Sequence, residues 1–147
     1  MQNAETILGI IEKKSTADKH YKFDRLYRNL FNPDFYLGAY GKIYAKEGNM
    51  TKGTDNETID GFGMKKVNEV IELMKNEQYH FKPVRRVNIP KKDGSKRPLG
   101  IPSFYDKVVQ EISRSILEAI YEPRFSKSSH GFRPKRSCHT ALKQVKR

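Results

Sequence analysis

One short stretch of alternating residues interrupts a chain whose apolar residues otherwise recur at three- and four-residue steps. VRRVNIP, from residue 84, alternates in polarity, an Asp93-Gly94 dipeptide follows, and RPLGIP continues the chain to residue 102. Two such runs on either side of an Asp-Gly dipeptide predict a β-hairpin, here over residues 84–101. Since the segments before and after it have helical periodicity, the expected fold class is α+β, mostly helical, with one hairpin.

The helical segments are marked by apolar stripes and by residues that start or end a helix. Asn32 followed by Pro33 predicts an N-cap and a first helical residue. Ser103 or Asp106 can cap the longest helix, which Pro123 ends. The aromatic stripe after Pro33 could stack on bases, but a stripe at helical spacing is more often core. We expect helices around residues 7–14, over 22–31, from 33 onward, over 61–78 and 103–121, and the start of a further helix near the end.

A long polar loop divides the chain into two parts. EGNMTKGTDNETIDG, residues 47–61, contains three glycines and has no sustained period. A loop of this length is usually functional or disordered. We therefore expect residues 1–60 to form a group of N-terminal helices that ends in this loop. Residues 61–147 then form a second unit, which contains the hairpin and the long helix.

The charge of the chain is strongly one-sided. Lys and Arg number 29 against 17 Asp and Glu, a formal net charge of +12. Residues 1–78 are balanced, so the whole excess lies in residues 79–147. A one-sided positive excess is typical of proteins that bind nucleic acid. A basic surface that only aids solubility, or one that contacts an anionic membrane, is the alternative interpretation.

The remaining bulk features favour an intracellular protein. No apolar run approaches the length that crosses a membrane, and the N-terminus lacks the pattern of a secretory signal. The single cysteine, Cys138, excludes an internal disulfide and suits the reducing cytoplasm. We expect a cytoplasmic protein with no membrane contact.

The register of the hairpin can be predicted from its apolar residues. A two-residue turn at Asp-Gly would mix apolar and polar partners on both faces. Shifting the pairing by one residue sets Val87 opposite Ile101 and Ile89 opposite Leu99, which gives a single apolar face. Because register follows the hydrophobic pattern where one face is buried, we expect the second arrangement.

The expected register brings cations together at the tip of the hairpin. It sets Lys91 opposite Arg97 and Lys92 opposite Lys96. Directly opposed like charges destabilise a strand pair by about 0.2–1 kcal/mol. An anion between Lys91 and Arg97 would reverse this effect, because Arg offers a planar fork to phosphate oxygens and Lys a mobile point charge. The alternative is that these lysines only prevent pairing with other strands.

The ordered motifs of the second half resemble a known family. IPKKDGSKRPLGIP and HGFRPKRS, within a match over residues 79–142, resemble the fingers region of group II intron reverse transcriptases, or maturases. The segment AKEGNMTKGTDNETIDGF resembles the loop of the N-terminal extension in the same family. In that family a Lys and an Arg six residues apart on the fingers hairpin bind the phosphates of the incoming dNTP. The resemblance implies this role for Lys91 and Arg97, whereas Lys92 and Lys96 are expected to be solvated.

The resemblance also implies contacts with nucleic acid at other places. Lys52, in the loop, would meet the template or the strand end that is copied, and HGFRPKRS would lie near the template. Gly131 is expected to shape a turn, and Phe132 to pack on a base or inside the fold. His130 and His139 are expected to pack or cap and not to bind a metal. The expected nucleic-acid-binding residues are Lys52, Arg85, Arg86, Gly131, Phe132, Arg133, Lys135 and Arg136.

The catalytic residues of the family are missing from this sequence. Reverse transcriptases of this kind hold two Mg²⁺ ions with aspartates of the palm, one set in a Tyr-Ala-Asp-Asp motif. Here no Asp follows Asp106 and no Tyr-x-Asp-Asp occurs. The resemblance therefore implies a fragment, without palm, thumb and later domains, which has no catalytic or metal site of its own. Mg²⁺ would belong to the full-length parent, an RNA-directed DNA polymerase.

We expect such a fragment to bind and not to polymerise. Its expected partners are intron RNA, template and primer nucleic acid, and dNTP. Apolar faces that a palm would cover are then exposed, so we also expect the fragment to self-associate. The alternative function is a stand-alone RNA-binding module without enzymatic activity.

Overall fold

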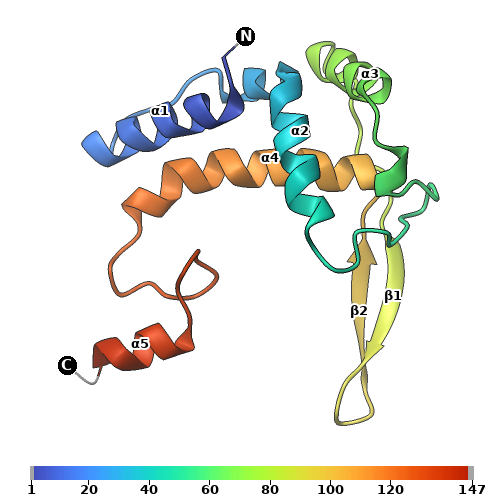
Figure 1. Ribbon diagram of the computed structural model, residues 1–147. Helices are drawn as coiled ribbons and strands as arrows, with labels where there is room; N and C mark the ends of the chain where they lie inside the picture. Colours follow the sequence, from blue (N-terminus) through green and yellow to red (C-terminus); the bar gives the residue numbers. More distant parts are fainter. Residues whose placement is uncertain (1, 146–147) are drawn as a thin grey trace.

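The computed structural model describes residues 2–145, which form a group of helices with a projecting β-hairpin (Figure 1). The elements are the helices α1 (Ala4–Ala17), α2 (Pro33–Tyr44), α3 (Met64–Lys75), α4 (Phe104–Tyr121) and α5 (Cys138–Val145), the 3₁₀ turns η1 (Leu26–Phe31), η2 (Ile59–Gly61) and η3 (Glu122–Arg124), and the strands β1 (Arg85–Pro90) and β2 (Lys96–Ile101). The predicted α+β class is confirmed.

Helix α4 is the central element and contributes more buried core residues than any other helix. It packs against α1 and α2 (Figure 1). Val108, Ile112 and Ile116 recur at four-residue steps, so they lie on one face of the helix, and each is buried. On α2, Tyr36 is fully buried and belongs to the same core, whereas Tyr44 at the end of that helix is exposed. The aromatic stripe after Pro33 is thus mainly core.

The predicted caps start the two helices as expected. The side chain of Asn32 accepts a hydrogen bond from the backbone N–H of Asp34 at 3.1 Å, and Pro33 is the first residue of α2. At α4, the hydroxyl of Ser103 accepts from the backbone N–H of Asp106 at 3.4 Å. Ser103 is therefore the cap, and the carboxylate of Asp106 is free for other partners.

Two predicted helices are shorter than their apolar patterns suggested. The segment 22–31 is helical only from Leu26, and as a 3₁₀ turn, because Arg25 has a φ of 54°. An α-helix cannot include a residue in this left-handed region. The helix predicted over 61–78 is α3, which begins after Gly63 and ends before Glu77, another residue with positive φ.

The hairpin exists where predicted, but the predicted register is wrong by two residues. Val87 lies opposite Leu99, and Ile89 lies opposite Arg97. A shift of two keeps every side chain on its predicted face, because strand side chains alternate with a period of two. The hairpin projects from the core and Leu99 is exposed, so burial does little to fix the register.

The geometry of the turn, and not burial, fixes the register. The N–H of Lys91 donates to the carbonyl of Ser95 at 2.8 Å, and the N–H of Gly94 donates to the carbonyl of Lys91 at 3.1 Å. This leaves a three-residue loop whose last residue, Gly94, has a φ of 80°, a conformation that suits glycine. Asp93 braces the turn by accepting from the N–H and the hydroxyl of Ser95 at 2.9 and 2.7 Å.

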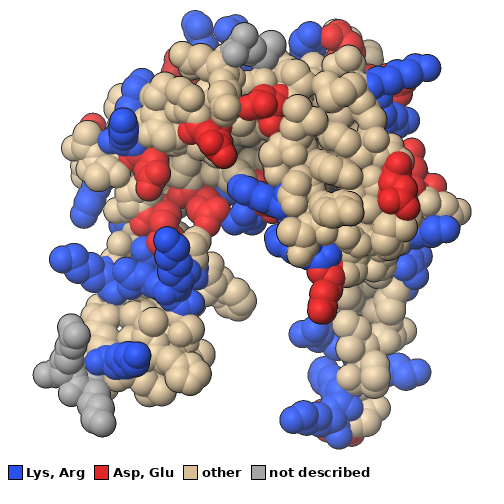
Figure 2. Space-filling view, viewed as in Figure 1, with Lys and Arg blue, Asp and Glu red and all other residues tan. Residues whose placement is uncertain are grey.

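The hairpin and the C-terminal segment, residues 122–145, extend from opposite ends of α4 toward the same side (Figure 1). The space-filling view shows the resulting outline of an arch, with a hollow between its two sides (Figure 2). Lys and Arg side chains gather at the tip of the hairpin and over the C-terminal segment. The candidate binding residues therefore lie on two separate parts of the molecule.

Candidate nucleotide and nucleic-acid interface

The tip of the hairpin carries Lys91 and Arg97 on one face. Because the register differs from the prediction, they are not directly opposite each other: Lys91 faces Ser95, and Arg97 faces Ile89. They are diagonal neighbours, a relation that typically separates Cα atoms by about 7–8 Å and leaves long side chains within reach of one another. Both residues are exposed. Lys96 lies opposite Pro90 on the other face of the ribbon.

No carboxylate neutralises these two cations in the part of the chain that the structure describes. The nearest acid in sequence, Asp93, is occupied by Ser95, and these hydrogen bonds lower the pKa of Asp93. The tip is therefore a hydrogen-bonded turn that presents cations to solvent. Such a surface can bind a polyanion without first breaking an ion pair.

The loop 47–61 is attached to the base of the hairpin. The Nε of Arg85 donates to the carbonyl of Lys52 at 3.0 Å, and the Nζ of Lys107 donates to the carbonyl of Thr51 at 2.7 Å. A Cβ on Gly53 would lie 2.7 Å from the Cα of Ser103, so only glycine allows this close approach. The structure thus brings Lys52 and Arg85, both predicted site residues, side by side.

Arg86 and Lys107 are two further cations near the base of the hairpin. Arg86 is exposed on the opposite face of β1, where it lies opposite Gly100 and points away from the face of Arg85. Lys107 was not predicted as a site residue. The signal in the sequence is a lysine near the N-terminus of a helix, where the helix dipole disfavours a positive charge.

A second set of hydrogen bonds holds the segment between α3 and β1. Asp106 is buried and accepts from the hydroxyl of Tyr79 at 2.6 Å and from the N–H of Lys82 at 3.0 Å. Burial, and then the bond to Asp106, raises the pKa of Tyr79. The ammonium of Lys82 in turn pairs with Asp55 of the loop at 2.9 Å. Loop, hairpin base and α4 are therefore joined directly.

The C-terminal segment uses its predicted arginines mainly inside the protein. The Arg133 side chain is only 7% exposed and pairs with Glu122 at 2.8 Å. It also donates to the carbonyls of Ser126 and Ser129 at 2.9 and 2.8 Å. The expectation that Arg133 meets phosphates thus has no support in its geometry, because its guanidinium holds the segment together. Arg136 donates to the carbonyl of Lys127 at 2.6 Å and is partly exposed.

Phe132 and Lys135 face solvent, whereas His130 is bonded within the segment. Phe132 is fully exposed and has a φ of 54°, so it does not pack inside the fold. Gly131 and Phe132 lie together in a turn, and Phe132 is the residue with positive φ. Lys135 is exposed and also has positive φ. Both nitrogens of His130 are occupied, by Thr140 and Gln144, in agreement with a structural role.

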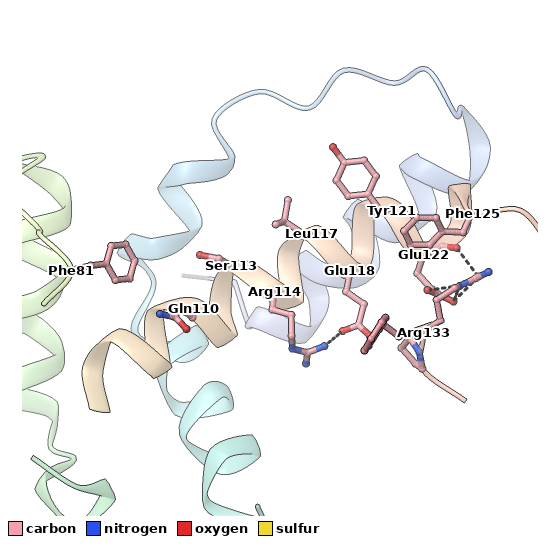
Figure 3. A pocket seen from close by; sticks show the side chains of 12 residues that line it. Phe81, Gln110, Ser113, Arg114, Leu117, Glu118, Tyr121, Glu122, Phe125 and Arg133 are labelled. Carbon is pink, nitrogen blue, oxygen red and sulfur yellow. Dashed lines mark hydrogen bonds and ion pairs between the residues drawn. The ribbon is translucent and has the colours of Figure 1, made fainter. Parts of the chain in front are cut away.

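An apolar groove of about 580 Å³ runs along the exposed side of α4 (Figure 3). Leu117 and Tyr121 of α4 form its floor, and Phe81 and Phe125 come from the segments on either side. Arg114 lies at its edge and pairs with Glu118 at 2.6 Å. The groove separates the hairpin side of the interface from the C-terminal segment.

The possible metal ligands of the described residues are spread over the molecule. Among residues 2–145, no three His, Cys, Asp or Glu side chains gather in a way that would hold a metal ion. No described helix has the length and hydropathy that crossing a bilayer demands.

Comparison with known proteins agrees with the motifs and the fold. The family model described as "Reverse transcriptase (RNA-dependent DNA polymerase)" matches residues 89–147, which include β2, α4 and α5. The group II intron-encoded protein LtrA of Lactococcus lactis subsp. cremoris is 50% identical over 148 residues, which cover 100% of this chain. The chain belongs to the group II intron reverse transcriptase, or maturase, family.

Other relatives of this family extend the comparison. An uncharacterised 91 kDa protein in the cob intron of Schizosaccharomyces pombe is 43% identical over 97% of this chain. The protein YkfC of Escherichia coli is 33% identical over 90% of it. The chain spans only 25% of LtrA, 18% of the S. pombe protein and 35% of YkfC. It thus corresponds to a part of each of these longer proteins.

Proposed function

We propose that this chain is the part of an intron-encoded RNA-directed DNA polymerase that binds the template and grips the incoming dNTP. The observation that carries the proposal is the exposed face of the hairpin tip, where Lys91 and Arg97 lie without a carboxylate partner among residues 2–145. A triphosphate has the charge and the length to meet both side chains. Arg97 would clamp two phosphate oxygens through its planar fork, and Lys91 would follow another oxygen as a mobile charge.

Four further cations that reach solvent at least in part suit a polynucleotide strand. Lys52 and Arg85 lie together at the base of the hairpin, and Lys135 and Arg136 lie on the C-terminal segment. Intron RNA, or the template and primer, would lie against these groups. Such contacts release counterions, so affinity for single-stranded RNA should fall steeply with salt.

The chemistry of nucleotidyl transfer would come from outside these residues. Two Mg²⁺ ions would activate the primer hydroxyl and stabilise the pyrophosphate that leaves, and the described carboxylates do not fit them. We therefore propose that the 147-residue chain binds nucleic acid and dNTP but does not extend a primer. Primer extension by this chain alone would contradict the proposal.

The test of the nucleotide site compares two neighbouring cations of the tip. In a polymerase that contains this chain, Arg97→Ala should raise the KM for dNTP by about 10- to 100-fold, the range expected for a lost charge-assisted hydrogen bond. Lys96→Ala is the matched control, because Lys96 has a similar charge but lies on the other face of the ribbon. RNA affinity should change little in either variant.

The same measurements separate the polymerase from a simple RNA-binding module. If Arg97→Ala weakens RNA binding as much as it raises the KM for dNTP, the hairpin only follows phosphates of a strand. If Lys96→Ala raises the KM for dNTP as much as Arg97→Ala does, the two faces of the hairpin contribute equally to dNTP binding. Either result would refute the proposed grip on the triphosphate.

A further inference from the structure

Lys107 occupies an unusual position for a lysine. It is the fourth residue of α4 and is partly buried at the base of the hairpin. Its ammonium donates to the carbonyl of Thr51 at 2.7 Å, and Arg85 donates to the next carbonyl of the loop at 3.0 Å. Two cations are therefore held on consecutive carbonyls of one short stretch of backbone.

No ion pair offsets these two charges in the portion of the chain that the structure describes. Burial, and after it the charge of Arg85, lowers the pKa of Lys107. Asp55 acts in the opposite direction, but its carboxylate is already engaged by Lys82 at 2.9 Å. The fold thus keeps a desolvated ammonium next to a guanidinium, an arrangement that an anion would stabilise.

The surroundings of Lys107 leave room for such an anion. An open hollow of about 490 Å³ lies between α4 and the end of α2, and Lys46 and Gln110 line it with Lys107. Two carboxylates also line it. Glu111 is engaged by Arg114 at 2.7 Å, and Glu47 remains as an acid of the loop. The hollow is therefore mixed in charge, and Lys46 and Lys107 are the lysines that line it.

The loop 47–61 forms one side of the hollow, and contacts within the protein hold this loop in position without a ligand. Gly53 lies so close to Ser103 that any side chain there would meet backbone atoms at 2.7–2.9 Å. The hydroxyl of Thr54 donates to the carbonyl of Pro83 at 2.9 Å on the other side. Because the loop is fixed at both points, the two cations are already in place when a ligand arrives, which lowers the entropic cost of binding.

We propose that Lys107, supported by Arg85, binds a backbone phosphate of the nucleic-acid strand that passes over the loop 47–61. Each of these side chains has donors left after its bond to the loop, since an ammonium has three N–H groups and a guanidinium five. The site lies at the base of the hairpin and not at the tip that grips the triphosphate. This inference rests on the proposed function, because it assumes that a strand reaches this face.

The test measures binding of the 147-residue chain to a fluorescent single-stranded RNA at several salt concentrations. Lys107→Met, which removes the charge and keeps the length, should weaken binding by about tenfold and reduce the slope of log K against log salt by about 0.7. Lys65→Met is the matched control, because Lys65 is exposed on α3 and does not line the hollow beside Lys107. Lys107→Arg should restore most of the affinity.

A second measurement on the unmodified chain covers the case in which Lys107→Met disturbs the loop. Acetylation of lysines, read by mass spectrometry, should be slowed by RNA at Lys107 and unchanged at Lys65. An unchanged salt slope in Lys107→Met with wild-type affinity would overturn this inference and leave the proposed function standing. Equal protection by an acidic peptide would also overturn it, and a wild-type chain that binds no RNA would refute both proposals.

Discussion

Replacing Asp106 by Asn tests how the hairpin is held to the helical core. The two oxygens of this buried carboxylate accept one bond each, from the Tyr79 hydroxyl at 2.6 Å and from the Lys82 N–H at 3.0 Å. An asparagine keeps one acceptor and places an NH₂ donor against the second partner, which is also a donor. A hydrogen bond to a charged group contributes about 1.5–3 kcal/mol, so Asp106→Asn should lower the free energy of unfolding by about 2–4 kcal/mol.

A double-mutant cycle separates this bond from other effects of the substitution. Tyr79→Phe alone should cost about 1.5–3 kcal/mol, and less in the Asp106→Asn chain, which gives a coupling energy of about 1 kcal/mol or more. Urea unfolding followed by far-UV circular dichroism measures all four proteins. Tyr44→Phe is the control, because Tyr44 is 60% exposed, and it should change stability by less than about 0.5 kcal/mol. Additive effects of the two substitutions, within about 0.5 kcal/mol, would refute the reasoning.

Three further predictions concern the loop, the response to acid and the exposed groove. Gly53→Ala should destabilise the chain by about 1–3 kcal/mol in urea unfolding, because its Cβ meets backbone; the control Gly41→Ala, in α2 with open space around it, should be neutral or stabilising. Burial alone would raise the pKa of Glu111, but Arg114 outweighs it and holds that pKa below its ordinary value of 4.5. The unfolded chain therefore binds the proton first as pH falls below about 4.5, and stability is lost in that range; urea unfolding from pH 6 to pH 3 of the wild type and of Glu111→Gln should show a smaller loss in the variant. The fragment should self-associate through its apolar groove. Phe132, a fully exposed residue that also lines this groove, is the residue to change: Phe132→Ser should weaken the association in sedimentation without lowering stability. A wild type that stays monomeric at high concentration would contradict this prediction.

Much of the architecture follows from local sequence. Asn32, Pro33 and Ser103 mark helix starts that the structure keeps, and the alternation around Asp93-Gly94 marks the hairpin. These features can be predicted from the sequence because a cap, a proline or a positive φ affects the conformation of neighbouring residues. The face on which Lys91 and Arg97 lie was also predictable, since alternation survives a shift of two residues.

The roles of several side chains depended on partners far along the chain. The register followed the turn geometry at Gly94 and not the apolar pattern, because the projecting hairpin buries too little to enforce that pattern. Arg133 was predicted to bind phosphate, but its guanidinium donates hydrogen bonds to Glu122, eleven residues earlier.

The sequence by itself determined a basic, mostly helical chain with one cation-tipped ribbon, because charge and periodicity are properties of neighbouring residues. Only the tertiary structure decided which cations remain available to a ligand. Lys107 reaches Thr51 across 56 positions of sequence, and no local pattern encodes that contact. Contacts between residues far apart in sequence decide whether a cation is bonded within the protein or remains exposed to solvent.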